Sequence, residues 1–323
     1  MKSSNIGGQA VMEGIMMRSG DRYSVGVRKP DGEIVVKVEP YTSFGKGKKI
    51  WSLPIFRGVI AFFESLIVGM KCLMYSASFL EDEEEEPSKE KKSKKVMTPE
   101  EKAQKEEKQQ KWMMYGTIAF SLILSIALFI MLPYFIASFL RHVTDSEIII
   151  SIAEACVRLV LFVGYLLLIS RMEDIQRVFM YHGAEHKCIN CVEHGLELNV
   201  ENVLKSSREH KRCGTSFLLF VMIVSIIFFL FIRVSTPWLR VIVRLLLLPV
   251  IAGVSYEIIR LEGRIDNKYV NLLSKPGLAL QKLTTREPDA KMAEVAIAAV
   301  EAVFDWRTYL KENFPEKYKG ETV

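Results

Sequence analysis

Residues 116–140 read GTIAFSLILSIALFIMLPYFIASFL and carry no charged side chain. An α-helix rises about 1.5 Å per residue, so this segment is long enough to cross the roughly 30 Å of hydrocarbon in a bilayer. Three further apolar runs have a similar character, at residues 148–170, 216–232 and 238–259. Only a few residues separate the last two, which favours a tight helical hairpin. Because helices satisfy their own backbone in lipid, the four runs predict an all-α polytopic membrane protein with four transmembrane helices.

A fifth apolar run, residues 53–80, is interrupted by three charged residues. Arg57, Glu64 and Lys71 are spaced by seven, which places them on one face of a helix. This pattern leaves three structures open: an amphipathic helix lying on the membrane, a re-entrant helix with its charged stripe against a polar site, or a full span. The full span is the least favoured, because charges near the bilayer centre are costly.

The Lys and Arg residues predict the orientation of the spans. There are 20 in residues 1–111, 7 in residues 171–212 and 11 from Arg260 to the end. The positive-inside rule therefore places both termini and the 171–215 loop in the cytosol. The first residues lack the apolar segment of a signal peptide, and the sequence contains no nucleic-acid-binding motif. We expect membrane lipid and other membrane proteins as partners.

Outside the apolar runs, the sequence predicts small cytosolic elements. The stretch YSVGVRKPDGEIVVKVEP, residues 23–40, alternates apolar and polar side chains around a Pro-Asp-Gly turn, which predicts a β hairpin. The residues after Arg260 predict amphipathic helices, with Asp289 as the cap of the second. The predicted parts are an N-terminal β element (1–52), an amphipathic or re-entrant helix (53–80), a charged linker (81–111), the four-span domain (112–260) and a cytosolic helical tail (261–323).

Potential metal ligands are concentrated in one short stretch. Residues 181–195 read YHGAEHKCINCVEHG and contain three of the five histidines and two of the five cysteines of the chain. His182, Glu185 and His186 form an H-x-x-E-H pattern, which on a helix places both histidines on one face with the carboxylate beside them. Zinc hydrolases use this arrangement because the metal acidifies water and a carboxylate accepts its proton. Such a helix needs a further ligand, for which Glu257 is one candidate.

A second interpretation uses other atoms of the same region. The pattern Cys188-x-x-Cys191 followed by His210-x-x-Cys213 has the spacing of a closed structural zinc site. In a reducing cytosol, neighbouring cysteines bind metal or react more often than they form disulfides. A third interpretation has no metal, the polar side chains being hydrogen-bonded to one another beneath the membrane.

Six short motifs are spread along the chain outside the charged linker. They are GGQAVMEGIMMRS (7–19), PIFRG (54–58), YHGAEHK (181–187), HKRCGTSF (210–217), SYE (255–257) and PGLALQKLTTREPD (276–289). Together they resemble the YqhQ-like family, a group of multi-span bacterial membrane proteins of unknown function that have been described as predicted metal-dependent enzymes. The resemblance implies a location in the bacterial cell membrane. It also implies a site made of His182, Glu185, His186, His210 and Cys213, because the family's motifs centre on these residues.

These observations predict a membrane-embedded, metal-dependent hydrolase, with Zn²⁺ as its cofactor and its site at the cytosolic membrane surface. In that scheme His182 and His186 bind the metal, and Glu185 acts as general base or third ligand. His210, Cys213 or Glu257 completes the site, and the candidates for binding an anionic substrate such as a lipid phosphate or carboxylate are Arg18, Arg57 and Arg260.

Two other classes of function stay open. One is a non-enzymatic membrane-biogenesis or scaffold protein, whose metal, if any, only holds the 171–215 loop in place. The other is a transporter, which the intramembrane pair Glu154 and Arg158 would permit, although no inverted repeat or pair of broken helices supports it. A catalytic metal keeps an open coordination position and a structural metal does not, so the number of protein ligands separates an enzyme from a scaffold.

Overall fold

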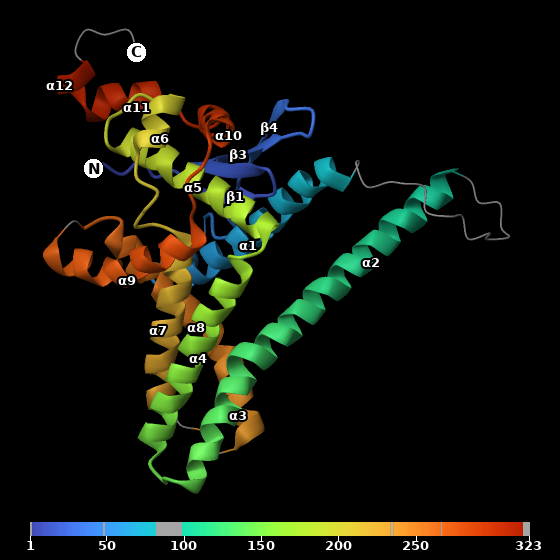
Figure 1. Ribbon diagram of the computed structural model, residues 1–323, viewed down its shortest axis with the longest axis vertical. Helices are drawn as coiled ribbons and strands as arrows, with labels where there is room; N and C mark the ends of the chain where they lie inside the picture. The colour runs from blue at the N-terminus through green and yellow to red at the C-terminus, as the bar shows by residue number, and fades with distance from the viewer. Residues whose placement is uncertain are drawn as a thin grey trace. The chain divides into compact units, whose positions relative to one another are not determined.

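The computed structural model is predominantly helical and carries a four-stranded antiparallel sheet near its N-terminus (Figure 1). The structure describes residues 2–47, 49–81, 99–232, 234, 236–265 and 267–318. The chain divides into two compact units, one formed by residues 1–83, 166–228 and 244–323 and the other by residues 84–165 and 229–243. Residues 82–98 of the predicted charged linker, 81–111, lie outside the described residues.

The sheet is larger than the predicted hairpin. Its strands are β1 (Gly7–Val11), β2 (Gly14–Ser19), β3 (Arg22–Arg28) and β4 (Ile34–Pro40), paired in the order β1-β2-β3-β4 with every pair antiparallel. The predicted hairpin is β3–β4 and is confirmed. The hairpin β1–β2 was not predicted. The first four residues of β2, Gly14 to Met17, are buried and apolar, so the strand lacks the alternation of apolar and polar residues that marks a hairpin.

The two faces of the sheet pack against different helices. Ile15 and Met17 lie in a core with α5 (Glu173–Glu193) and α10 (Ala290–Glu301). Met16 lies in a second core on the opposite face, which includes Cys72 of α1 (Phe56–Glu81). Alternate residues of β2 therefore enter alternate cores, as the two-residue period of a strand requires. The sheet holds α5 on one side and α1 on the other.

The remaining helices lie between and after these elements. They are η1 (Lys49–Ser52), α2 (Pro99–Ile126), η2 (Ala127–Met131), α3 (Leu132–Ser138), η3 (Phe139–His142), α4 (Glu147–Ile169), α6 (Val200–Lys205), α7 (Gly214–Phe231), α8 (Pro237–Glu262), α9 (Lys268–Thr284), α11 (Trp306–Asn313) and α12 (Pro315–Tyr318). The last part of the predicted linker belongs to α2, which begins at Pro99. Asp289 caps α10 as predicted, because its side chain accepts a 2.8 Å hydrogen bond from the Met292 N–H.

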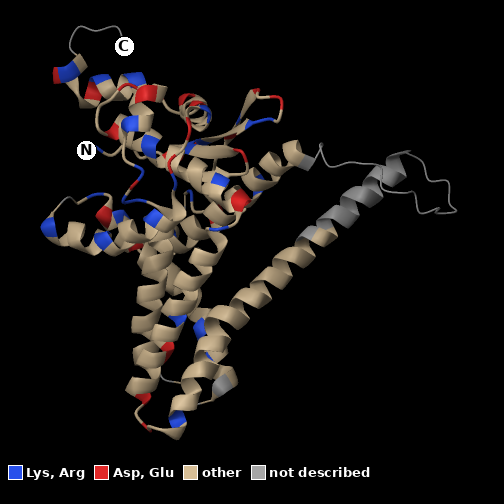
Figure 2. Cartoon of the chain, viewed as in Figure 1, with Lys and Arg blue, Asp and Glu red and all other residues tan. Residues whose placement is uncertain are grey.

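Five helical segments among the described residues are long and apolar enough to cross a membrane. They are Phe56–Leu80, Tyr115–His142, Glu147–Ile169, Gly214–Phe231 and Trp238–Glu262. Charged side chains are sparse along α4, α7 and α8 and frequent on the sheet, α5 and the C-terminal helices (Figure 2). Within α4, Glu154 and Arg158 form the predicted i,i+4 ion pair at 2.7 Å, and both side chains are buried. The chain is a multi-pass membrane protein.

Candidate metal centre

The H-x-x-E-H residues lie on α5, and this part of the helix is enclosed on several sides. Nearly every residue of α5 from Tyr181 to Glu193 is buried. The segment that follows α9 also crosses close to α5. A Cβ atom added at Gly183 would overlap the carbonyl oxygen of Arg286. Gly183 therefore permits a close approach between α5 and this segment, which carries a hydrogen-bond acceptor for the site.

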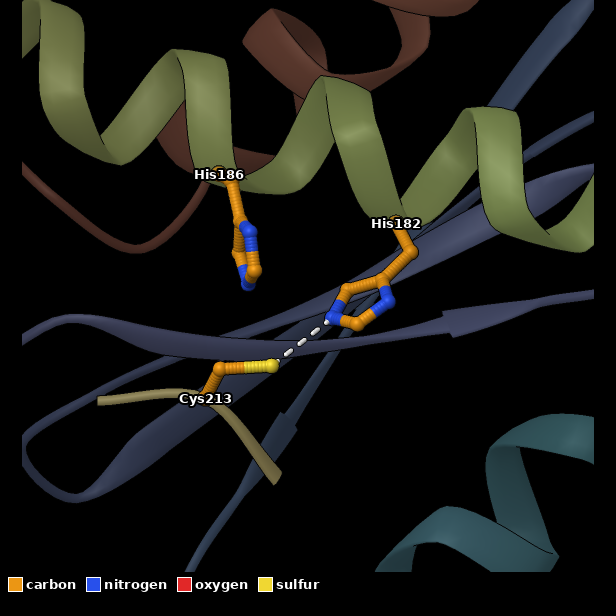
Figure 3. Close-up of side chains that lie close together, drawn as sticks. All are labelled: His182, His186 and Cys213. Carbon is orange, nitrogen blue, oxygen red and sulfur yellow. Dashed lines mark hydrogen bonds between the residues drawn. The ribbon is translucent and has the colours of Figure 1, made fainter. Parts of the chain in front are cut away.

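Two histidines and one cysteine form a compact cluster. One ligand atom from each of His182, His186 and Cys213 lies within 4.8 Å of the others (Figure 3). The Nε2 atom of His182 is 3.2 Å from the Cys213 sulphur, and the two imidazole rings are 4.4 Å apart between centroids. Among the described residues, this is the one group of three potential ligands with that spacing. Of the three candidates predicted to complete the site, Cys213 is the one that the structure places beside both histidines.

Both histidines are held in the orientation that metal binding needs. The Nδ1 atom of His182 lies 2.9 Å from the carbonyl oxygen of Thr284, and the Nδ1 atom of His186 lies 2.6 Å from that of Arg208. A carbonyl oxygen only accepts hydrogen bonds, so each Nδ1 carries the proton and each Nε2 keeps its lone pair. Metal-binding histidines usually have such an outer partner, which fixes the tautomer and the ring.

Cys213 lies at the start of α7, where its sulphur accepts a hydrogen bond. The Thr215 N–H is 3.3 Å from the sulphur. The thiolate is the form of cysteine that binds metals. Two imidazole Nε2 atoms and one sulphur are a donor set that fits Zn²⁺, with one position left for a further group.

Glu185 lies beside the cluster, beneath strand β1. Burial raises the pKa of Glu185 to about 7, and the nearby His182 and a hydrogen bond from the Gly8 backbone amide oppose a larger rise. The contact with β1 is close. A Cβ atom at Gly8 would lie 2.9 Å from the carboxyl carbon of Glu185 and 2.7 Å from the carbonyl oxygen of Met16. Glycine is required at position 8 for the carboxylate to occupy this place.

His182 of the cluster lines a cavity of about 440 Å³. Its polar lining includes His182, Glu185 and Arg212, and the remainder is largely apolar. A second cavity of about 490 Å³ shares Gly8 and Arg212 with the first and is lined by Arg18. Of the three arginines predicted to bind substrate, Arg18 lines this second cavity. Its guanidinium stacks on the ring of Tyr41, 3.5 Å from the centroid.

Arg212 was not among the predicted site residues, although it precedes Cys213 in the HKRC stretch. Its guanidinium donates to the side chains of Glu193 and Ser3. Glu193 is fully buried and also accepts hydrogen bonds from the backbone N–H and the hydroxyl of Ser4, each 2.7 Å long. These contacts fix Arg212 at the boundary between the two cavities.

His210 belongs to this second network and not to the metal cluster. Its Nε2 atom lies 3.5 Å from a carboxylate oxygen of Glu193, at the outer limit of a hydrogen bond. Burial lowers the pKa of His210 to about 4, so the imidazole is neutral at neutral pH. For Glu193, burial alone would raise the pKa, but the nearby His210 side chain, the charge of Arg212 and the Ser4 N–H lower it to about 2.

The structure does not bring Glu257 into the cluster. Glu257 forms a two-pronged ion pair with Arg57, in which the Arg57 Nε donates to a carboxylate oxygen at 2.6 Å. Arg260 lies on the same helix, and its Nη1 is a buried atom without a hydrogen-bond partner in the described part of the chain. Two of the three predicted substrate-binding arginines are therefore placed near Glu257, apart from the residues that line the 440 Å³ cavity.

The alternative four-ligand zinc site is not assembled. Cys188 and Cys191 are buried in the core between the sheet, α5 and α10. The thiol of Cys191 donates to the carbonyl oxygen of Glu197 at 3.2 Å. Burial raises the pKa of Cys188 well above its usual value, which disfavours the thiolate. Both cysteines pack as small apolar side chains, while Cys213 lies with the two histidines of α5.

Comparison with known proteins gives the family. Residues 53–306 match a family model described as "Protein of unknown function (DUF1385)". The chain belongs to this family. It is also 36% identical over 317 residues to the "Uncharacterized protein YqhQ" of Bacillus subtilis (strain 168), which covers 95% of this chain and 94% of that protein. The predicted resemblance to YqhQ-like proteins is confirmed. No solved structure matches the chain.

Proposed function

We propose that this DUF1385 chain is a zinc-dependent hydrolase whose site lies at the cytosolic surface of the membrane. The observation that carries the proposal is the cluster of His182, His186 and Cys213, of which His182 lines a cavity that Glu185 also lines. Three protein ligands and an adjoining space are typical of a catalytic zinc site, whereas a structural site has four protein ligands.

The side chains around the cluster have distinct roles in this proposal. When bound, the ion would supply a Lewis acid that polarises a substrate oxygen and acidifies water. Glu185 would accept the proton of the attacking water and return it to the leaving group, because its carboxylate lies beside His182 on the cavity wall. Arg212 would bind an anionic group of the substrate, with its guanidinium held in place by Glu193.

We also propose that four of the five apolar helices cross the membrane while α1 lies at its cytosolic interface. Support comes from the contacts of α1. Its residues Val68, Cys72 and Tyr75 pack against the sheet. Glu64 accepts hydrogen bonds from the Ser43 hydroxyl at 2.7 Å and from the hydroxyl of Tyr41. A helix with one face on a polar domain and an apolar opposite face suits an interface. The Lys and Arg distribution supports cytosolic termini.

Metal binding is tested with cobalt. Purified full-length protein is stripped of metal and titrated with Co²⁺, which reports a cysteine ligand through a sulphur-to-cobalt charge-transfer band. We expect one ion per chain and loss of the band in Cys213→Ser. Cys191→Ser is the matched control, because Cys191 is buried near the site but lies outside the cluster, and it should keep the band. A band that persists in Cys213→Ser would contradict the ligand set.

Catalysis is tested separately from metal binding. Glu185→Gln keeps the shape of the side chain but cannot accept a proton, so it should retain the cobalt band and lose the function of the protein in cells that lack the wild-type gene. Complementation is scored at matched protein level. Full complementation by Glu185→Gln, together with failure of Cys213→Ser through low protein abundance, would indicate a scaffold with a structural metal.

A further inference from the structure

The lining of the 440 Å³ cavity includes three ionisable side chains, termed its polar end below, and large apolar side chains of two other helices. The polar end is formed by His182, Glu185 and Arg212. The apolar part of the lining includes four side chains that are large and substantially exposed: Leu66 (54%), Met70 (40%) and Leu73 (39%) of α1 and Leu218 (45%) of α7. These four residues, termed the entry slot below, belong to two helices that are apolar enough to lie in a membrane.

The apolar side of the entry slot continues along α1. Phe63, Leu66, Ile67, Met70, Leu73 and Met74 are all exposed and follow one another at intervals of three, one, three, three and one residues. This spacing forms a single stripe on a helix. The opposite side of α1 packs against the sheet. An exposed apolar stripe of this length indicates contact with lipid or with another apolar partner.

We propose that the entry slot admits an anionic amphiphile directly from the bilayer, with its head group at the polar end and its hydrocarbon chain between α1 and α7. The chemistry at the head group rests on the function proposed above, whereas the binding of the chain does not. The ligand is a long-chain molecule bearing a phosphate or a carboxylate, the anions that a guanidinium binds best.

The position of the slot explains why it suits a lipid. Leu218 lies in the first turns of α7, four residues after Gly214, where the apolar helix begins. The metal cluster therefore lies at the depth where a lipid head group meets its chain. A ligand that enters here keeps its chain among apolar side chains, so no methylene group has to pass through water. A peptide in the same position would leave backbone N–H and C=O groups against apolar walls, which is costly.

Arg212 gives the polar end its charge selectivity. Its contacts with Ser3 and Glu193 hold the guanidinium in place, and an arginine has more donors than these two contacts use. A neutral lipid would gain no ion pair with Arg212. We therefore expect the head group, and not the chain, to distinguish the ligand from the surrounding lipid, because lipid tails are as apolar as the walls of the slot.

The test uses a photoreactive probe. Full-length protein in phosphatidylcholine vesicles is mixed with a small amount of hexadecyl phosphate that carries a diazirine midway along its chain, irradiated, and mapped by mass spectrometry. We expect labelling of residues 65–73 of α1 and 214–218 of α7. Unlabelled hexadecyl phosphate or palmitate should compete with the probe for labelling, and the stronger competitor shows whether the polar end of the cavity prefers a phosphate or a carboxylate. Inorganic phosphate should not compete.

Two matched variants separate the slot from the general lipid surface. Leu218→Trp fills the slot while remaining apolar, and an overpacking penalty should reduce labelling of these segments about tenfold. Leu167→Trp is the control, because Leu167 is similarly exposed (42%) on α4 and does not line the cavity. It should leave the labelling unchanged.

The outcomes test lipid binding in the slot separately from the proposed hydrolase activity. Equal labelling of α4 and of the slot, no effect of Leu218→Trp, or competition by inorganic phosphate alone would overturn the proposal. The labelling is measured with zinc and with a chelator. Slot labelling that persists in protein shown to bind no metal would support lipid binding in the slot and contradict the proposed zinc hydrolase. A normal cobalt band without slot labelling would support the metal site and contradict lipid binding in the slot.

Discussion

Adjacent glycines on β1 provide a matched pair of substitutions for the position of Glu185. A Cβ atom at Gly8 would lie 2.7 Å from the Met16 carbonyl oxygen and 2.9 Å from the Glu185 Cδ, whereas a Cβ at Gly7 has no neighbour within 4 Å in the described structure. Carbon and oxygen atoms normally approach to about 3.3 Å, so Gly8→Ala requires a shift of roughly 0.6 Å in a paired strand. The buried carboxylate of Glu185 must move as well.

The expected magnitude follows from these overlaps. Overpacking costs about 1–3 kcal/mol, and replacing glycine by alanine in a strand returns roughly 0.5–1 kcal/mol. Gly8→Ala should therefore be destabilising by about 1–2 kcal/mol, while Gly7→Ala should be neutral or slightly stabilising. Thermal unfolding of the detergent-solubilised variants measures the difference. The cobalt band should survive in both, because neither substitution contacts a ligand.

The two glycine substitutions should also differ in complementation. Gly8→Ala should resemble Glu185→Gln in complementation, because it displaces the carboxylate from its place beneath β1. Gly7→Ala should complement fully. If Gly8→Ala is as stable as Gly7→Ala and complements as well, Glu185 does not occupy the position that the proposed mechanism needs.

Further predictions concern the networks around the site. Because the pKa of Glu193 falls from 4.5 to about 2 on folding, its ionisation stabilises the fold by roughly 3 kcal/mol above pH 4.5, and this is lost as the pH falls towards 2. The buried neutral His210 adds stability that is lost as the pH falls from 6.5 to about 4. Denaturant unfolding of wild type and Glu193→Gln should show a difference in the free energy of unfolding that becomes smaller as the pH falls from 7 to 3. Glu257→Ala should keep the cobalt band, and its effect on stability should be less than additive with that of Arg57→Ala, because the two are paired. A cysteine introduced at the exposed position Glu201 of α6 should be labelled by a membrane-impermeant thiol reagent in permeabilised cells and not in intact cells; labelling from outside would reverse the proposed orientation.

The sequence predicts the apolar helices well because length and composition alone determine whether a segment suits a bilayer. It predicts less of the sheet. β3–β4 has an alternating pattern and a Pro-Asp-Gly turn, and both signals point to a hairpin. The hairpin β1–β2 lacks them because β2 is enclosed by α5 and α10 on one face and by α1 on the other. A strand buried on both faces has no periodic pattern that separates it from other apolar segments.

The metal cluster is predictable only in part, for a related reason. His182 and His186 share a helix face through their local spacing, so the sequence predicts their proximity directly. The third ligand depends on how α7 meets α5, and spacing along the chain left Glu257, His210 and Cys213 as equal candidates. Glu257 and His210 each lie beside a different residue, Arg57 and Glu193 respectively.

The outer partners of both histidines are backbone carbonyl oxygens, which no side-chain motif can reveal. The carbonyl of Thr284 precedes the segment that crosses Gly183, so the orientation of His182 depends on a glycine that binds nothing itself. Cys213, in turn, directly precedes the apolar helix α7. The depth of the sulphur relative to the bilayer is therefore set by where the apolar sequence begins. A chain that spans the membrane can place a side chain near the head-group level in this way, and the proposed metal site would use this arrangement.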